Sequence, residues 1–302
     1  NTFPVNSPKW LSKKILKKGG ILSFHDFMNI VLNDPKNGYY GSGKAKIGKK
    51  GDFVTSPSLS DDFAYLLAKQ LEEWLIQISE NFIFKEKLTI VEFGSGNGSL
   101  LEGIIYYFLQ NNHDLIKKTS FIILEINKGM IQSQKIKLNK FLKQGIDISW
   151  MNISELNEES INGVVIAHEV LDAFPVERVQ YKKGQICRQG IKLDQEKQSL
   201  TFKNMPLTND LKKFIREIKD ELGIDIPPLS VSEEWTTELH VNNSSWAKNI
   251  YSKINNGVLL IVDYAIDSKR YYSSHKKEGT ILAYKDQYAF KEILNNPGDC
   301  DI

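Results

Sequence analysis

The sequence has 302 residues, of which 41% are hydrophobic and 25% charged, and its 39 basic and 37 acidic side chains leave a net charge of +2. The balance of charge argues against a dedicated nucleic-acid-binding or membrane-surface protein, because such proteins carry a basic excess. No apolar run approaches the ~18 residues that cross a bilayer, and no signal peptide opens the chain. The two cysteines, Cys187 and Cys300, are typical of free thiols. We therefore expect a protein of the bacterial cytoplasm with no membrane insertion and no nucleic-acid partner.

Residues 1–60 are predicted to form a separate helical cap that ends in a glycine-rich loop. Apolar residues between Phe24 and Leu32 recur at helical spacing, and Asn33-Asp34-Pro35 ends that helix. The next segment has glycines at positions 38, 41, 43, 48 and 51. It is too long for a turn and too rich in glycine for a core element, which makes it a candidate lid or binding loop.

The rest of the chain, residues 61–302, alternates helices with apolar strands. After a helix from about Ser60 to Ser79, strands are predicted over 88–93, 121–126, 148–151, 164–167 and 258–262. Apolar strands separated by helices indicate a parallel sheet covered on both faces, so the fold class is α/β, with a doubly wound, Rossmann-like sheet. Alternating segments at 176–181, 185–192 and 199–202, with helices near 208–221 and 244–254, predict a β-rich insertion over about 176–245 that forms part of a substrate cleft.

The strongest chemical signal is Glu92-Phe93-Gly94-Ser95-Gly96-Asn97-Gly98, which follows the first of these strands and precedes a helix. Its glycines allow a ligand to approach the backbone at a helix N-terminus. A dinucleotide-binding turn would carry Gly or Ala in place of Ser99. Glu92 would repel a pyrophosphate, but it would attract the ammonium and sulfonium of S-adenosylmethionine by roughly 4 kcal/mol at about 4 Å. The motif therefore predicts an S-adenosylmethionine site.

Other residues at the carboxyl ends of the strands extend this predicted cofactor site. Glu125 ends the second strand and could accept both ribose hydroxyls, with an ordinary surface acid as the alternative. Asn152 follows the third strand and either reaches the adenine edge or simply forms a turn. Ile126, Ser95 and His168 complete the set, His168 as a packed residue rather than a base. The spacing of His and Cys residues suggests no metal site.

Two carboxylates, Glu169 and Asp172, follow the fourth strand, where the methyl group of a bound cofactor would project. Methyl transfer is an in-line displacement, so an enzyme mainly positions the nucleophile and stabilises charge. These acids would hold and orient a cationic amine or guanidinium. The alternative is structural: Asp172 caps a following helix and Glu169 pairs with a core arginine.

The sequence resembles the MidA family of bacterial and mitochondrial methyltransferases over nearly its whole length. The shared motifs are Asp34-Pro35-x-x-Gly38-Tyr39-Tyr40, Gly51-Asp52-Phe53-Val54-Thr55-Ser56-Pro57, Glu92-x-Gly94-x-Gly96-x-Gly98, Glu125 after the second strand, His168-Glu169-x-x-Asp172-Ala173-x-Pro175-Val176, Thr237-Glu238, Asp263-Tyr264, Gly279-Thr280-x-x-Ala283-Tyr284 and Asn296-Pro297-Gly298. This sequence departs from the family at Ser58, where Glu is usual, and at His168, where Asn is usual. The family also continues well beyond Asn296-Pro297-Gly298, so we expect a truncated C-terminus.

This resemblance implies a class I methyltransferase fold and methylation of an arginine in a protein, such as a subunit of an NADH dehydrogenase (complex I-type) assembly. It assigns Glu92, Gly94, Gly96 and Gly98 to the methionine part of the cofactor, Glu125 to the ribose, and Glu169 and Asp172 to the guanidinium. The segment with Gly51, Asp52, Phe53, Thr55, Ser56 and Pro57 would close over the cofactor and, with Glu238 and Tyr264, contact the substrate.

Two other functions remain open at this point. One is a non-catalytic assembly chaperone on the same fold, and the other is a dinucleotide-dependent oxidoreductase, which Glu92 and Ser99 disfavour. The oligomeric state is also open, with a homodimer as one option.

Overall fold

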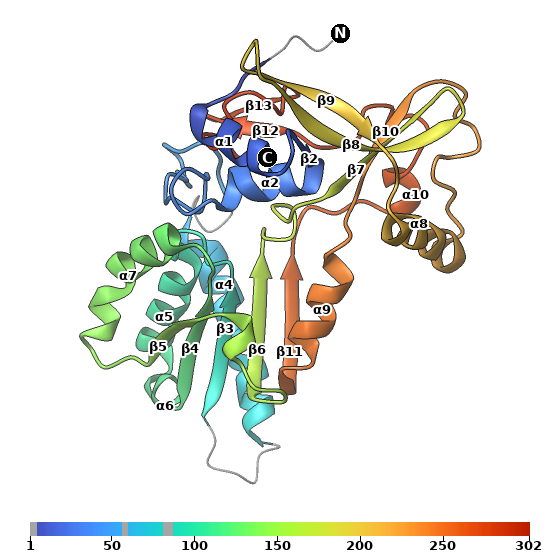
Figure 1. Ribbon diagram of the computed structural model, residues 1–302. Helices are drawn as coiled ribbons and strands as arrows, with labels where there is room; N and C mark the ends of the chain where they lie inside the picture. Colours follow the sequence, from blue (N-terminus) through green and yellow to red (C-terminus); the bar gives the residue numbers. More distant parts are fainter. Residues whose placement is uncertain (1–4, 56–59, 81–86) are drawn as a thin grey trace.

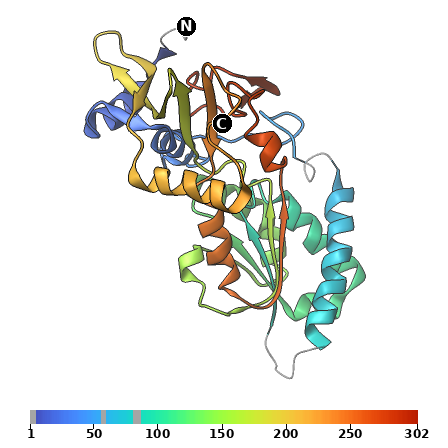
Figure 2. The same cartoon turned by 90° about the vertical axis from the view of Figure 1, so that its right-hand side faces the viewer.

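The computed structural model describes residues 5–55, 60–80 and 87–302. The molecule has two parts, one above the other in the view of Figure 1: a lower part built on a parallel sheet and an upper part built on an antiparallel sheet. The C-terminus lies in the upper part (Figures 1 and 2). No helix in these ranges is long and apolar enough to span a membrane.

The lower sheet has the strand order β11-β6-β3-β4-β5, and every pair of neighbours is parallel. The strands are β3 (Leu88–Phe93), β4 (Thr119–Leu124), β5 (Ile148–Met151), β6 (Ile161–His168) and β11 (Ile254–Val262). All five predicted strands are therefore present. Glu92 of β3 lies in the middle of the sheet, between Ile123 of β4 and Ile166 of β6.

Helices cover both faces of this sheet, as a doubly wound fold requires. The helices of the lower part are α4 (Asp61–Glu80), α5 (Ser99–Asn111), α6 (His113–Lys117), α7 (Lys128–Leu142) and α9 (Asn243–Tyr251), with a 3-10 turn η1 at Ile153–Glu155. On one face, Leu71, Ile104 and Phe141 of α4, α5 and α7 pack in one core with the sheet. On the other, Trp246 and Ile250 of α9 pack against the sheet. The predicted α/β class is confirmed.

The upper sheet has the order β1-β9-β8-β7-β10, and β2 also pairs with β8. The upper part contains β1 (Val5–Asn6), α1 (Lys9–Lys17), β2 (Ile21–Ser23), α2 (Phe24–Asn33), β7 (Glu177–Lys182), β8 (Gln185–Asp194), β9 (Ser199–Met205), α8 (Asn209–Leu222), β10 (Trp235–Leu239), α10 (Ser268–Tyr271), β12 (Ala283–Lys285) and β13 (Tyr288–Phe290). The N-terminal segment thus shares a sheet with the insertion, since Val5 pairs with Leu200 and Leu22 with Ile191.

The last residues of the chain also belong to the upper part. Phe24 of α2, Leu200 of β9, Ile293 and Ile302 lie in one hydrophobic core. Residues that are far apart in the sequence therefore bury their apolar faces together, and burial of such faces is the main source of stability. The N-terminal cap, the insertion and the end of the chain pack as one unit.

Helix α2 lies above the carboxyl ends of the lower strands (Figure 1). Its apolar residues, among them Phe27 and Val31, are buried in the upper core. His25, Asn29 and Asn33 recur every four residues and line a cavity below the helix. The 3.6-residue period of the helix explains this division, because residues four apart share a face.

Candidate active site

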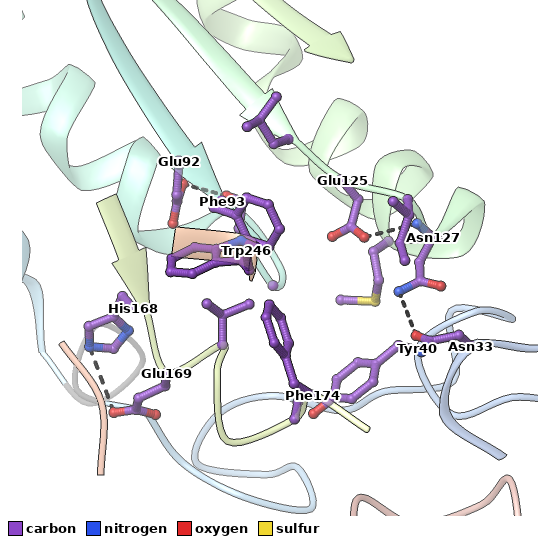
Figure 3. A pocket seen from close by; sticks show the side chains of 18 of the residues that line it. Asn33, Tyr40, Glu92, Phe93, Glu125, Asn127, His168, Glu169, Phe174 and Trp246 are labelled. Carbon is purple, nitrogen blue, oxygen red and sulfur yellow. Dashed lines mark hydrogen bonds and ion pairs between the residues drawn. The ribbon is translucent and has the colours of Figure 1, made fainter. Parts of the chain in front are cut away.

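A cavity of about 590 Å³ lies between the two parts, at the carboxyl ends of β3, β4 and β6. In parallel α/β sheets this edge is where ligands bind, because the loops that leave the strands diverge there. The wall on the lower side carries Glu92, Glu125 and Glu169, and the opposite wall carries Asn33 and Tyr40 (Figure 3). The cavity thus joins the ends of three strands to the roof formed by α2.

The turn between β3 and α5 has a backbone that needs its glycines. Gly94, Gly96 and Gly98 have φ of +66°, +51° and +82°, in the left-handed region that residues with a Cβ rarely adopt. A Cβ at Gly94 would lie 2.4 Å from Cγ2 of Val170, and one at Gly96 would lie 3.1 Å from Cδ1 of Ile47. The turn is therefore packed against the loop after β6 on one side and the predicted lid loop on the other.

Glu92 is a buried acid at the floor of the cavity. Its carboxylate accepts a hydrogen bond from the hydroxyl of Ser95 in the glycine turn. Burial raises the pKa of Glu92 to about 7, with the nearby carboxylate of Glu125 adding to the rise and the Ser95 bond opposing it. Within the described residues no Lys or Arg pairs with Glu92. A cationic ligand in the cavity would supply the missing charge and restore the ionised form.

Glu125, directly after β4, is held in place by two donors. Its Oε1 accepts from the backbone N–H of Asn127 at 2.9 Å, and its Oε2 accepts from Nε2 of Gln134 at 3.2 Å. The same Gln134 Nε2 donates to the carbonyl of Gly96 at 2.8 Å, and its Oε1 accepts from Nε1 of Trp150 at 3.0 Å. One buried amide thus connects the glycine turn, the acid after β4 and the end of β5.

The sequence interpretation missed Gln134. A signal was present, because a polar residue interrupts the apolar face of α7 formed by Met130, Leu138 and Phe141. A fully buried amide in such a face must find partners, and these partners lie in the site.

The turn after β6 brings acids to the mouth of the cavity. Glu169 lines the cavity, and its φ of +47° lies in the left-handed region. Asp172 does not line the cavity and reaches the surface. Packing of protein atoms around its carboxyl, with the carboxylates of Asp263 and Asp301, raises the pKa of Asp172 to about 7. No helix begins at Asp172, so the alternative interpretation of this residue as a helix cap is wrong.

The chain also matches known proteins. A family model described as S-adenosyl-L-methionine-dependent methyltransferase matches residues 66–302. The chain belongs to this methyltransferase family. S-adenosyl-L-methionine, which Glu92 and the glycine turn predicted, is the cofactor of the family.

Individual methyltransferases match most of the chain. It is 26% identical to the mitochondrial protein arginine methyltransferase NDUFAF7 of Bos taurus and of Homo sapiens, in each case over 95% of this chain and 64% of the relative. It is 25% identical to the Caenorhabditis elegans homolog over 97% of this chain and 68% of that protein. The chain therefore spans about two thirds of the length of these relatives.

Solved structures confirm the methyltransferase fold. A superfamily member from Burkholderia thailandensis, crystallised with S-adenosyl-homocysteine, has a TM-score of 0.78 and 25% identity, covering 99% of this chain and 75% of that one. A second crystal structure from this organism, at 23% identity, has a TM-score of 0.75 and covers 99% and 74% of the two chains. The class I methyltransferase fold predicted from the sequence is thus confirmed.

The remaining residues that were predicted to contact the cofactor also lie at the cavity. Ile126 is 66% exposed and lines the cavity, as does Asn152. The backbone N–H of Asn152 donates to the carboxylate of Glu155 at 2.6 Å, so this residue also begins a turn. His168 is buried against the ring of Phe63, and burial lowers its pKa. It is therefore a neutral, packed residue at neutral pH.

Only part of the segment that was predicted to contact the substrate lines the cavity. Phe53 and Thr55 line the cavity. Gly51 and Asp52 do not; Asp52 is buried and accepts hydrogen bonds from the Tyr39 hydroxyl at 2.8 Å and the backbone N–H of Asp286 at 3.0 Å. Asp52 therefore ties the lid loop to the β12–β13 hairpin. Ser56 and Pro57 lie outside the described residues.

The two other predicted substrate residues lie in different places. Glu238 of β10 is buried away from the cavity, where its carboxylate accepts from Nε of Arg178 at 3.1 Å and from the backbone N–H of Thr280 at 2.8 Å. Tyr264 is 72% exposed at the mouth, and its hydroxyl donates to Oε1 of Glu169 at 3.3 Å. No cluster of His, Cys, Asp or Glu in the described ranges is arranged to hold a metal ion.

Proposed function

We propose that this chain binds S-adenosyl-L-methionine and transfers its methyl group to an arginine side chain of a protein. The observation that carries the first half is the buried Glu92 beside the glycine turn. A phosphate-bearing nucleotide would bring negative charge next to this acid, which argues against a dinucleotide-dependent oxidoreductase. The ammonium of an amino acid would instead complement it.

Specific residues fit each end of the cofactor. Glu92 would accept the ammonium, the backbone N–H groups of the glycine turn would face the carboxylate, and Glu125 would accept the ribose hydroxyls. Ile126 and Asn152 would contact the base. Among the residues that the structure describes, the cavity lining contains these acids and no lysine, which matches a positively charged nucleoside better than a dinucleotide.

The observation that supports an arginine substrate is the group of acids at the mouth. Glu169, Asp172 and Asp263 lie at the ends of β6 and β11, and Asp301 approaches from the end of the chain. Among the described residues, Asp172, Asp263 and Asp301 form no ion pair with Lys or Arg. A guanidinium has a fixed charge and five donors, which suit several carboxylates at once.

The chemistry requires little beyond orientation and charge. Bound S-adenosyl-L-methionine supplies a methyl group on a positively charged sulfur. Glu169 would align the acceptor nitrogen with the methyl group, since it lines the cavity. The nitrogen loses a proton as it gains the methyl group, and Asp172 would accept this proton because its pKa of about 7 suits proton exchange at neutral pH.

The names of the relatives support a protein substrate. They are protein arginine methyltransferases, and the resemblance to the MidA family implies a subunit of an NADH dehydrogenase-type complex as the target. We propose that substrate class for this chain as well.

Transfer of a labelled methyl group tests this function. The chain is incubated with isotopically labelled cofactor and with a lysate that contains the NADH dehydrogenase complex, and labelled residues are mapped by mass spectrometry. Glu169→Gln and Asp172→Asn should keep the affinity for S-adenosyl-homocysteine within about threefold and lower transfer by a factor of about 100 or more. Glu196→Gln, on the exposed β8–β9 turn, is the control.

The outcomes separate the candidate functions. Labelled arginine supports the proposal, and a label confined to another residue type overturns the arginine assignment. Normal cofactor binding with no transfer to any protein would instead favour a non-catalytic assembly role.

A further inference from the structure

The turn after β6, residues 169–172, has a backbone that requires support from outside. Glu169 has φ +47°, and a residue with a Cβ in this region costs of order 1–2 kcal/mol. Such conformations persist at functional sites only when the surrounding structure holds them. The question is therefore which groups hold this turn.

The support comes from the end of β11. Oδ2 of Asp263 accepts hydrogen bonds from two successive backbone N–H groups of the turn, from Val170 at 3.1 Å and from Leu171 at 2.8 Å. The backbone N–H of Glu169 donates to the carbonyl of Val262 at 2.7 Å. Three consecutive N–H groups of the turn thus bond to two consecutive residues, Val262 at the end of β11 and Asp263 directly after it.

Asp263 is also fixed on its other side. Its Oδ1 accepts from the backbone N–H of Tyr264 at 2.8 Å, and the hydroxyl of Tyr264 reaches Glu169. A carboxylate is the only common side chain that can accept bonds from three N–H groups with its two oxygens, and such charge-assisted bonds are stronger than neutral ones. Its position leaves the residue no direct contact with the cavity.

We propose that Asp263 is a positioning residue for methyl transfer, which holds the 169–172 turn in its strained form and thereby keeps the carboxylates of Glu169 and Asp172 at the mouth. This inference rests on the proposed function, which gives those two acids their roles. The charge of Asp263 also acts on the turn. The carboxylate of Asp172 is surrounded by the carboxylates of Asp263, Glu169 and Asp301 and by the hydroxyls of Tyr40 and Tyr264.

Two substitutions separate the hydrogen bonds from the charge. Asp263→Ala removes all three acceptor contacts. Asp263→Asn keeps one side-chain oxygen for Val170 and Leu171 but removes the negative charge. The matched control is Asp194→Ala on the β8–β9 turn, where Oδ1 accepts from the backbone N–H groups of Glu196 and Lys197, both at 3.0 Å.

Two measurements need no activity. In Asp263→Ala, amide hydrogen exchange at Val170 and Leu171 should be faster than in wild type, and the control should leave it unchanged. In Asp263→Asn, an NMR titration of the Asp172 carboxyl should show a lower pKa than in wild type, because a neighbouring negative charge has been removed. A residue that only stabilises the fold would not shift this titration.

The third measurement is transfer. Asp263→Ala should lower kcat by about tenfold or more while the affinity for S-adenosyl-homocysteine stays within about threefold. Wild-type exchange at Val170 and Leu171 in the Ala variant would overturn the proposal, as would an unchanged Asp172 titration in the Asn variant. If the wild-type chain transfers no methyl group, the proposed function fails, and exchange and titration still decide whether Asp263 holds the turn.

Discussion

Replacing Glu92 with Gln should weaken the binding of S-adenosyl-homocysteine to this chain by about thirtyfold or more at pH 8. The substitution keeps the volume of the side chain and an oxygen that can accept the hydrogen bond from Ser95. It removes only the negative charge at the floor of the cavity. The loss in affinity therefore measures the attraction between this carboxylate and the ammonium of the ligand.

The size of the effect follows from the position of Glu92. Opposite charges about 4 Å apart attract by about 4 kcal/mol at the effective dielectric of a partly screened site. The cavity opens to solvent at its mouth, so about 2 kcal/mol is a reasonable lower figure, and this corresponds to about thirtyfold in Kd. If Glu92 contacted only the ribose or the base, the loss of affinity in Glu92→Gln would not depend on whether the ligand carries an ammonium.

The pH dependence of ligand affinity provides a second, independent test of the contact between Glu92 and the ammonium. Burial raises the pKa of Glu92 to about 7, so the residue is mostly neutral at pH 6 and mostly ionised at pH 8. The ammonium favours the ionised form, so affinity should increase with pH across this interval in wild type and should be flat in Glu92→Gln. Binding near pH 7 should also release a proton, since the ligand lowers the pKa of the carboxyl.

Isothermal titration calorimetry at pH 6, 7 and 8 measures these quantities. 5′-Methylthioadenosine is the control ligand, because it lacks the ammonium and should bind wild type and Glu92→Gln equally. Glu196→Gln, on an exposed turn, is the control variant. Equal affinity of wild type and Glu92→Gln for S-adenosyl-homocysteine at pH 8 would refute the reasoning.

Three further predictions follow from the same contacts. The pKa of Glu92 lies at about 7 in the folded chain and at its ordinary 4.5 in the unfolded one, so the folded state loses stability as the pH rises from 4.5 to 7. Glu92→Gln should therefore raise the free energy of unfolding at pH 8 by about 1–3 kcal/mol. Equal melting temperatures of wild type and variant at pH 8 would contradict this. Gly94→Ala should destabilise the chain more than Gly98→Ala in thermal denaturation, because only the first methyl group meets a neighbour, Val170, at 2.4 Å, whereas the second lies 3.7 Å from the closest atom. Gln134→Met should reduce affinity for S-adenosyl-homocysteine in the calorimeter by roughly tenfold, since it removes the amide that orients Glu125 and the glycine turn, and an unchanged Kd would show that the amide is only structural.

The sequence predicted the lower part of the fold closely, because that part is specified by local patterns. The strands at 88–93 and 148–151 have the predicted bounds. Apolar runs of this length between helices can be buried only inside a covered sheet. The acid and the glycines at the end of β3 were predictable for the same reason, since motif and strand are adjacent in the chain.

Several strands and helices of the upper part were predicted, among them β7, β8, β9, α2 and α8, but their arrangement was not, because it depends on long-range contacts. Nothing local indicates that Val5 pairs with Leu200, or that Ile302 shares a core with Phe24. The shared motifs placed Glu238 in the substrate site, whereas the structure buries it beside Arg178. A motif indicates that a residue matters without showing whether it binds a ligand or supports the fold.

The support of the site was also hidden from the sequence. Asp263 acts through backbone groups of a turn more than 90 residues earlier in the chain. The left-handed conformation of Glu169 could not be predicted from its residue type, because Glu has no preference for this conformation. Only the pairing of β6 with β11 brings these residues together.

The central claim is that the carboxylate of Glu92 receives the positively charged end of an adenosyl ligand. A crystal structure of this chain with S-adenosyl-homocysteine tests it most directly. The account predicts the ligand ammonium within hydrogen-bonding distance of the Glu92 carboxylate and the ribose hydroxyls on Glu125. A ligand bound in the opposite direction, with its base against Glu92 and its ammonium elsewhere, would contradict it.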